Sequence, residues 1–382
     1  MYLDLNFVDG QSWAEKTAAK MRELAVEHCE QLRDCNRTGT FPATIYREMG
    51  SRGWVGPVTP TEFGGLGGGI AEYCLVCEEA AKLNLPSPQI SVQGQQWLLR
   101  WGTADQQARY LGGIATGTTI FSESISEHGT ASSLRDLKTR AVRDGTDWIV
   151  TGEKTHVNLG HQSDVTLVYA NAEGYGLTAF LVDTALPGVT SKQTDPVGLR
   201  MLPTADMRFD GVRIPQDAVL GEPGLGMDTF LTTFNVSRLG NASELIGYAE
   251  RALAHGISYA QSRQVGQSMV AEYQGIQWTV ADLYASLFAA SLSRDHAAQV
   301  ADSGRDPALA TSIAKKLAID AAERCVNDVF ALIGSYGLYA NTDFAQLMSD
   351  VKVYRIAGGS LEVLRNFVAR RVLKSDTYGA MR

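Results

Sequence analysis

The sequence predicts an α+β protein with three successive domains, because the pattern of apolar residues changes twice along the chain. Residues 1–117 and 226–382 carry apolar residues at helical spacing, whereas residues 118–225 contain short β-rich runs separated by turn residues. We therefore expect an N-terminal all-α domain at 1–117, a middle β-barrel-like domain at 118–225 and a C-terminal four-helix bundle at 226–382. Strands and helices do not alternate, which argues against a Rossmann dinucleotide domain.

Local patterns support each domain. In the N-terminal part, apolar residues recur three or four apart at Ala14, Ala18, Met21, Ala25, Cys29 and Leu32. Runs at 148–150, 166–169, 177–182 and 207–214 predict strands, with turns expected at Asp144-Gly145 and Asp210-Gly211. Beyond residue 226, long Ala/Leu-rich stretches are broken near 304–307 and 334–337, which predicts four long helices joined by short loops.

The composition is that of a globular protein without a broad basic surface. The 382 residues are 45% hydrophobic and carry a formal net charge of −8, so we expect no nucleic-acid or anionic-membrane partner. The N-terminal residues show no signal-peptide pattern, and no apolar run reaches about 18 residues. We therefore expect a cytoplasmic protein without membrane spans.

The five cysteines favour reduced thiols over a disulfide framework, because their number is odd and no secretion signal precedes them. Cys74 and Cys77 form a C-x-x-C, a spacing used by some metal and redox sites. No second cysteine or histidine pair lies near them in the sequence, and both thiols share one face of a predicted helix. We interpret them as core residues and predict no metal site.

Five segments resemble, in order along nearly the whole chain, motifs of the acyl-CoA dehydrogenase family. They are TEFGGLG at 61–67, WGTADQQARYL at 101–111, SEHGTASS at 126–133, FDGVRIP at 209–215 followed by VLG at 219–221, and the spacing of Tyr259, Arg263, Gln274 and Asp282. Each motif is weak alone, but the ordered set is specific. The resemblance implies the acyl-CoA dehydrogenase-like fold.

The resemblance also implies a chemistry, the α,β-desaturation of an acyl thioester with FAD as cofactor. A carboxylate removes the α-proton while the β-hydrogen leaves as hydride to the flavin, which carries the electrons. The implied substrate is an acyl group bound to CoA or to an acyl carrier protein. The implied assembly is a homodimer or homotetramer formed through the C-terminal helices.

By position, the resemblance assigns flavin contacts to several residues. Ser126 offers a hydroxyl to the isoalloxazine edge, Asn158 replaces a threonine behind the ring, and Arg263 binds the diphosphate from a neighbouring subunit. Gly266 and Ala331 replace an aromatic residue and a glutamine on the adenine side. The full set of implied cofactor-binding positions is Ile125, Ser126, Ser132, Val157, Asn158, Arg263, Gly334, Ser360 and Glu362.

Both positions that hold the catalytic base in the family lack a carboxylate in this chain. The C-terminal position is Gly358, within Ala357-Gly358-Gly359-Ser360, and the alternative position on an earlier helix is Ser237, which precedes Arg238. Neither residue accepts an α-proton. An ordinary desaturase reaction therefore needs a substitute.

Three residues are candidates for that substitute, and each also has a plain structural interpretation. Glu244 lies seven residues after Ser237, on the same face of a predicted helix, but it equally suits a solvated or ion-paired position. Glu123 precedes Ser126 by three residues, or simply ends a strand. His156 replaces a tryptophan that packs on the flavin and titrates near neutrality, or only fills space.

Three functions remain open at this point. The first is a flavin-dependent acyl-thioester oxidoreductase with an atypical or absent base. The second is a base-less partner subunit of a hetero-oligomer with a catalytic relative. The third is an enzyme that uses the same cleft for non-redox chemistry such as isomerisation or cyclisation. Flavin content, and the response of the flavin to acyl thioesters, distinguish them.

Overall fold

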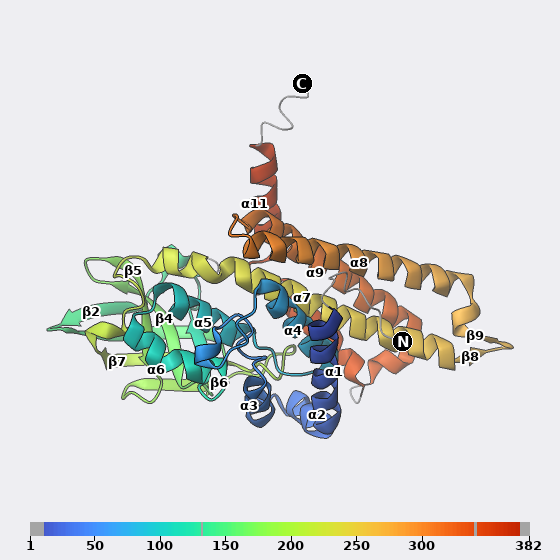
Figure 1. Cartoon of the computed structure of the whole chain (residues 1–382), viewed down its shortest axis with the longest axis horizontal. Helices are drawn as coiled ribbons and strands as arrows, with labels where there is room; N and C mark the ends of the chain where they lie inside the picture. The colour runs from blue at the N-terminus through green and yellow to red at the C-terminus, as the bar shows by residue number, and fades with distance from the viewer. Residues whose placement is uncertain (1–10, 131–132, 340–341, 375–382) are drawn as a thin grey trace.

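The computed structural model describes residues 11–130, 133–339 and 342–374, and it confirms the predicted fold class. Helices form the N-terminal part, a curled sheet the middle, and long helices the C-terminal part (Figure 1). The N-terminal elements are α1 (Gln11–Glu27), α2 (Cys29–Thr38), α3 (Ala43–Ser51), the 3₁₀ turn η1 (Thr61–Phe63), α4 (Ile70–Leu83), α5 (Gln89–Trp101) and α6 (Ala104–Ala115).

The predicted apolar face of the first helix is only partly correct. Met21 and Leu32 are buried as expected, but Cys29 is exposed. The helix is interrupted at His28, whose φ and ψ are −106° and 18°, and α2 begins at the next residue. This break changes the phase of the helical repeat, so Cys29 no longer shares the buried face. Cys74 and Cys77 are buried free thiols on α4, as predicted.

The middle part is one seven-stranded sheet in the order β1-β4-β2-β3-β7-β6, with β5 paired to β4. The parallel pairs β1–β4 and β2–β4 are not joined by crossover helices, so no βαβ unit arises. The strands are β1 (Phe121–Ser124), β2 (Arg140–Asp144), β3 (Asp147–Asn158), β4 (Val165–Ala172), β5 (Gly176–Asp183), β6 (Val189–Gln193) and β7 (Thr204–Ile214), with 3₁₀ turns η2 (Leu134–Asp136) and η3 (Gln216–Ala218).

The turn expected at Asp210-Gly211 is wrong, because β7 continues through both residues. Gly211 has a φ of +63°, and the pairing of β3 with β7 shifts between Val150 and Gly152. The extra residue is therefore absorbed as a bulge, which a glycine permits. The turn at Asp144-Gly145 does connect β2 and β3.

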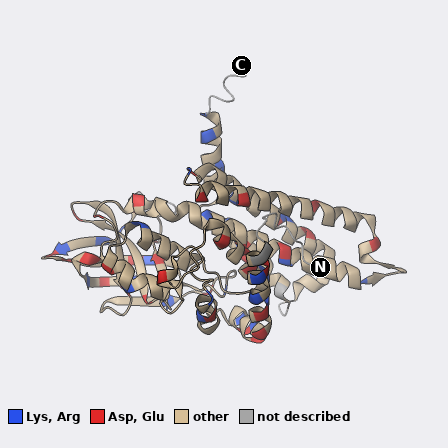
Figure 2. Cartoon of the chain, viewed as in Figure 1, with Lys and Arg blue, Asp and Glu red and all other residues tan. Residues whose placement is uncertain are grey.

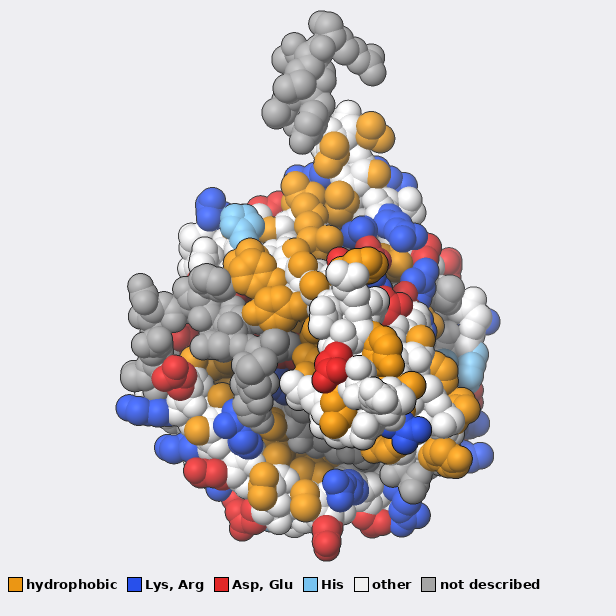
Figure 3. Space-filling model, turned by 90° about the vertical axis from the view of Figure 1, so that its right-hand side faces the viewer, with side chains coloured by type: hydrophobic (Ala, Val, Ile, Leu, Met, Phe, Trp, Pro, Cys, Tyr) orange, Lys and Arg blue, Asp and Glu red, His pale blue; other side chains and the backbone are white. Residues whose placement is uncertain are grey.

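The C-terminal part is a bundle of three long helices and a shorter one, with a further helix projecting from it (Figure 1). The elements are α7 (Gly226–Ser262), the hairpin β8 (Gln264–Val265) and β9 (Ser268–Met269), η4 (Val270–Glu272), α8 (Gln274–Asp302), α9 (Ala308–Ile333), η5 (Gly334–Leu338), α10 (Asp343–Tyr354) and the projecting α11 (Leu361–Leu373). Hydrophobic side chains continue from the projecting part onto the body below it (Figure 3).

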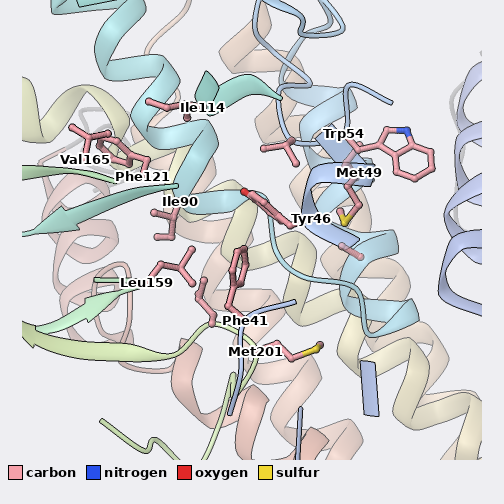
Figure 4. Close-up of a cluster of buried hydrophobic side chains, with 14 of the residues drawn as sticks. Phe41, Tyr46, Met49, Trp54, Ile90, Ile114, Phe121, Leu159, Val165 and Met201 are labelled. Carbon is pink, nitrogen blue, oxygen red and sulfur yellow. The ribbon is translucent and has the colours of Figure 1, made fainter. Parts of the chain in front are cut away.

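An apolar core joins the N-terminal helices to the middle sheet. Tyr46 and Met49 of α3, Ile90 of α5, and Phe121 and Val165 of the sheet belong to one buried cluster (Figure 4). This packing fixes the strand β1 relative to α5. Charged residues of both signs are interspersed along the elements in view (Figure 2). Among the described residues, no helix is long and apolar enough to cross a membrane.

Candidate functional site

The segment that follows β1 is anchored by a buried ion pair. Glu127 accepts hydrogen bonds from the backbone N–H of Lys138 (2.6 Å), from the N–H and hydroxyl of Thr139 (3.0 and 2.6 Å) and from Nζ of Lys154 (2.8 Å). Burial acts to raise the pKa of Glu127, but the bonds from Lys154 and Thr139 lower it overall. Nζ of Lys154 also donates to the carbonyl of Ile125 (2.9 Å). The pair thus holds the backbone of the predicted flavin segment.

The end of β3 lies beside the same segment. The N–H of Thr155 donates to the carbonyl of Ser126 (2.8 Å), which brings together the predicted residues Ser126, His156 and Asn158. The side chains of Ser126 and His156 are exposed, and Asn158 is half-buried. Val157 is buried in the core of the sheet, so only its backbone is available to a ligand. Ser132 lies outside the described residues.

His156 has an unusual backbone conformation, with a φ of +57°. Its ring lies 6.5 Å from the ring of His128, centroid to centroid, in an edge-on arrangement. Both histidines are exposed. Positive φ is uncommon for a residue with a side chain and is concentrated at functional sites. The two imidazoles therefore stand on the open side of the predicted flavin segment rather than in the interior.

The two positions expected for a base are closed off by neutral and cationic groups. Gly358 has a φ of +65°, and a Cβ added to it would lie 2.1 Å from Nδ2 of Asn241 and 3.2 Å from Nζ of Lys315. Nζ of Lys315 donates to the carbonyls of Ala357 and Gly359, at 3.0 Å for the latter. Ser237 is 8% exposed on α7, one helical turn before Asn241. No carboxylate occupies either position.

Two buried basic side chains lie next to the expected base positions. Lys315 is 0% exposed and Arg238 is 4% exposed, and neither has a carboxylate within 4.0 Å among the described residues. Nη1 of Arg238 donates to Ser312 (3.0 Å), and the guanidinium lies over the ring of Phe234. Its Nε has no hydrogen-bond partner in the part of the chain that the structure describes. Burial lowers the pKa of Arg238 to about 10, and burial together with Arg238 lowers that of Lys315 to about 7. At neutral pH the guanidinium of Arg238 is therefore charged, with no carboxylate counter-ion among the described residues.

Glu244 lies in the interior behind these groups. It is 1% exposed, and its two oxygens accept hydrogen bonds from the hydroxyls of Ser87 and Tyr354. Burial raises the pKa of Glu244 to about 7, although these two hydrogen bonds lower it. Asn241, one turn earlier on α7, lies against Gly358. The predicted alignment of Glu244 with Ser237 on α7 is correct, but both carboxylate oxygens are already occupied.

Glu123 is in a different setting, on β1 opposite Leu167 of β4. Phe121, two residues earlier on the same face, packs against Gly94 of α5, so Glu123 also faces the helices. The side chain is half-buried and has no hydrogen-bond or ion-pair partner within the part of the chain described. Burial raises the pKa of Glu123 to about 8, and any water that enters this space reduces the increase.

A row of aromatic rings extends from the helix-facing side of β1, where Glu123 lies, to the loop at Gly358. The ring of Tyr169 lies 6.5 Å from that of Trp97 and 6.2 Å from that of Phe230, which lies 5.2 Å from Phe234. Phe234 lies 3.1 Å from the Cβ position of Gly359. The Tyr169 hydroxyl is buried and has no hydrogen-bond partner among the residues described. We call Trp97, Tyr169, Phe230 and Phe234 the aromatic row.

The remaining predicted cofactor residues lie on the bundle. Tyr259, one turn before Arg263, packs near Tyr336 of η5 at 6.3 Å, so the end of α7 lies beside the turn that begins at Gly334. Arg263 and Gly334 are exposed. The hydroxyl of Ser360 accepts the N–H of Val363 (3.4 Å) and caps α11. Glu362 is exposed and lies 3.4 Å from Arg355.

Three protein-family models match consecutive parts of the chain. The acyl-CoA dehydrogenase N-terminal domain matches residues 14–118, the middle domain 122–212 and the C-terminal domain 224–373. The chain belongs to the acyl-CoA dehydrogenase family. Members of this family are flavoproteins.

Individual relatives agree with this assignment. The chain is 30% identical over 365 residues to a 3-(aryl)acrylate reductase of Clostridium sporogenes, covering 92% of this chain and 96% of the relative. It is 29% identical over 364 residues to a caffeyl-CoA reductase–Etf complex subunit of Acetobacterium woodii, covering 92% and 95%. A glutaryl-CoA dehydrogenase of Mycobacterium smegmatis, solved with FADH2, has the same fold, with a TM-score of 0.91, 24% identity and coverage of 98% and 99%.

Within this member of the family, sequence reasoning missed four residues beside the expected base positions or in the aromatic row: Gln89, Asn241, Lys315 and Tyr169. Asn241 could have been found, because it lies four residues after Ser237 and therefore on the same helical face. Lys315, on another helix, has no such signal in the sequence. The buried hydroxyl of Tyr169 has none either.

Proposed function

We propose that this chain binds FAD and transfers a hydride between the flavin and the β-carbon of an acyl thioester, with a proton-transfer group outside the family's usual positions. The observation that carries the proposal is the combination of a complete three-domain acyl-CoA dehydrogenase fold with Gly358 and Ser237 at the base positions. The chain retains the three-domain framework of the family and has no carboxylate at either base position.

The residues present fit a flavin dinucleotide. The exposed Ser126 and the half-buried Asn158 supply hydroxyl and amide groups beside a backbone segment that the Glu127–Lys154 pair holds in place. The exposed Arg263 suits a diphosphate. Gly334 keeps the neighbouring turn free of a side chain, and a Cβ there would meet nothing within 4 Å. FAD, when bound, supplies the hydride chemistry at the β-carbon.

Of the three candidate proton-transfer groups, Glu123 suits the role best. Its carboxyl faces the helices, two residues before Ile125 of the flavin segment, and has no partner within the described ranges of the chain. Glu244 is sequestered by Ser87 and Tyr354. His156 stands on the exposed side. With a pKa near 8, the carboxyl of Glu123 is protonated at neutral pH and donates a proton rather than accepting one.

A proton donor favours the reductive direction, in which a 2-enoyl thioester gains a hydride at the β-carbon and a proton at the α-carbon. Two of the relatives are named as reductases, and one belongs to a complex with an electron-transferring flavoprotein. We therefore assign the electron supply to a partner of that kind. The acyl group is carried by CoA or by an acyl carrier protein.

The assembly that suits this chain is a homodimer or homotetramer built through the C-terminal helices. The projecting α11 leaves Val363, Val372 and Leu373 exposed, at 39%, 39% and 85%. Exposed apolar surface of this kind is typical of an interface between subunits. Arg263, exposed at the end of α7, is then available to a flavin held by the neighbouring subunit.

The visible spectrum of the purified protein tests the proposal. We expect bound flavin and, after anaerobic reduction, its reoxidation by a 2-enoyl thioester such as crotonyl-CoA. A protein that stays colourless with excess FAD and binds none by calorimetry would contradict the proposal and favour non-redox chemistry. Flavin that responds to thioesters only when a second family member is co-expressed would make this chain the base-less partner subunit.

A further inference from the structure

The side-chain amide of Asn241 is held in one orientation. Its Oδ1 accepts a hydrogen bond from Nε2 of Gln89, which also donates to the carbonyl of Ser237 (2.9 Å). With Oδ1 engaged in this way, Nδ2 points toward the loop at 357–359, and its only hydrogen-bond contact among the described residues is the carbonyl of Ala357 at 3.5 Å. The network therefore fixes which end of the amide faces the loop.

Nδ2 of Asn241 has a free capacity to donate. Its contact with Ala357 is longer than the usual 2.7–3.2 Å of an N–H···O bond, and the group carries two N–H bonds. Asn241 is only 2% exposed. A buried donor without a good partner is costly, so a polar partner is expected from a ligand.

The place where this donor points is defined by Gly358. A side chain at Gly358 would project onto Nδ2, with its Cβ at 2.1 Å, so Nδ2 stands in the direction that the family's catalytic carboxylate would take. Gly358 and Gly359 are half-buried, so the loop keeps a face open to a ligand. Phe234 of the aromatic row lies against Gly359 and bounds the same space.

The surrounding charge selects the kind of partner. Lys315 and Arg238 are buried near Asn241 without a carboxylate within 4.0 Å in the described part of the chain. The positive charge of Arg238 and the N–H donor of Asn241 attract an oxygen acceptor and disfavour bare hydrocarbon. Gln89, Asn241 and Ser237 make the lining polar where an alkyl chain needs apolar contacts.

From these contacts we infer that Asn241 is a specificity-determining residue, whose Nδ2 donates a hydrogen bond to an oxygen substituent on the acyl group close to the reacting carbons. The substrate class is then an acyl thioester that bears a hydroxyl or carbonyl oxygen near the thioester, rather than a plain fatty acyl thioester. Gln89 is a positioning residue that acts through Asn241. The inference rests on the proposed function and adds to it that the acyl group lies beside Gly358.

A matched pair of ligands tests it on the flavin-loaded protein. Butyryl-CoA and 3-hydroxybutyryl-CoA differ by one oxygen, and their dissociation constants follow from calorimetry and from the change in the flavin spectrum. We expect the wild type to bind 3-hydroxybutyryl-CoA about 10- to 100-fold more tightly, the range for giving a weakly paired buried donor a good acceptor. Asn241→Leu should remove this preference, measured as the ratio of the two dissociation constants.

Two further variants serve as a control and as an alternative to Asn241→Leu. Asn171→Leu changes an asparagine of β4 that binds the carbonyl of Leu137, away from Gly358, and should leave the preference unchanged. Gln89→Leu frees the amide of Asn241 to turn and should reduce the preference without removing the donor. If Asn241→Leu loses its flavin, Gln89→Leu tests the inference in its place.

The outcomes separate the inference from the proposed function. Equal or tighter wild-type binding of butyryl-CoA overturns the inference, while the proposed function stands as long as the flavin responds to either thioester. An unchanged preference in Asn241→Leu also overturns it. If the protein retains no flavin, or no thioester perturbs it, the proposed function fails and the inference fails with it.

Discussion

The amide of Asn241 occupies the space into which a side chain at Gly358 would project, because a Cβ there would lie 2.1 Å from Nδ2. The two residues come from α7 and from the loop before α11. A side chain at 358 therefore requires the amide of Asn241 to move. The absence of a carboxylate at 358 and the position of the Asn241 amide are therefore linked structurally.

Substitution of Gly358 should be more costly than its backbone conformation alone explains. Gly358 and Gly145 share a φ of +65°, but a Cβ at Gly145 meets nothing within 4 Å. We expect Gly145→Ala to lower the free energy of unfolding by about 1–2 kcal/mol, the cost of the left-handed conformation. Gly358→Ala should cost about 1–3 kcal/mol more, because it overpacks against Asn241.

Urea unfolding of the two variants measures this difference. Equal costs would show that Asn241 moves aside freely. The same comparison extends to Gly358→Glu, which should be less stable than the double variant Gly358→Glu/Asn241→Ala. In the double variant a carboxylate at this position no longer meets the amide of Asn241.

The pH dependence of enoyl-thioester reduction should report on Glu123. Its pKa is raised to about 8, so the carboxyl is protonated below that pH and loses its proton as the pH rises through it. A proton donor then fails, and we expect the rate of the single-turnover reduction to fall above about pH 8. Glu123→Gln should remove this dependence along with most of the rate, whereas His156→Ala should preserve it. A profile unchanged in Glu123→Gln would exclude this residue as the donor.

Glu244 should instead affect stability. Its native pKa is raised to about 7 from an ordinary 4.5, so between these pH values the folded protein binds more protons than the unfolded chain. The free energy of unfolding contributed by Glu244 therefore falls as the pH rises from 4.5 to 7 and is constant above that range. Glu244→Gln, which keeps partners for Ser87 and Tyr354, removes this fall.

The measurement is the free energy of unfolding of Glu244→Gln relative to wild type at pH 4.5 and pH 8. Because one pKa unit corresponds to 1.36 kcal/mol, we expect the variant to gain about 2–3 kcal/mol relative to wild type between the two. The comparison cancels other groups with raised pKa values, such as Asp350. A difference that does not vary with pH would mean that Glu244 is ionised in the folded protein.

The pair of Lys154 and Glu127 should matter for flavin retention. Lys154→Met leaves the carboxylate of Glu127 buried without its cation and frees the carbonyl of Ile125. Loss of one partner of a buried pair costs about 3–5 kcal/mol, so we expect a lower unfolding temperature and a lower flavin-to-protein ratio. Lys316→Met, which breaks the exposed pair with Asp320 (2.6 Å), is the matched control and should change neither.

The fold could be predicted from the sequence because helices and strands each leave a pattern among neighbouring residues. Helical and strand periodicity do not depend on distant contacts, and they predicted β3, β4, β5 and β7. The errors at Cys29 and Gly211 arose where one residue, His28 in the first case and the glycine itself in the second, changes the phase of a regular element. The domain boundaries at 117/118 and 225/226 stay a prediction.

The sequence predicts the site only where its residues lie on the same helix or strand. The vacancies at Gly358 and Ser237 are visible in the sequence, as is the shared helical face of Ser237 and Glu244. What fills the vacancy depends on Asn241 being oriented by Gln89 of α5, more than 150 residues earlier. Likewise, Lys315 reaches the loop from α9. Contacts between elements so far apart have no local pattern, so the sequence alone could not show them.

The most direct test of the account is the rate at which the anaerobically reduced protein is reoxidised by crotonyl-CoA, followed by stopped-flow absorbance of the flavin. The account predicts reoxidation by the wild type, a rate about 10²- to 10⁴-fold lower in Glu123→Gln, and little change in Glu244→Gln. Reoxidation at the same rate in wild type and Glu123→Gln, or no reoxidation by any enoyl thioester tested, would contradict it.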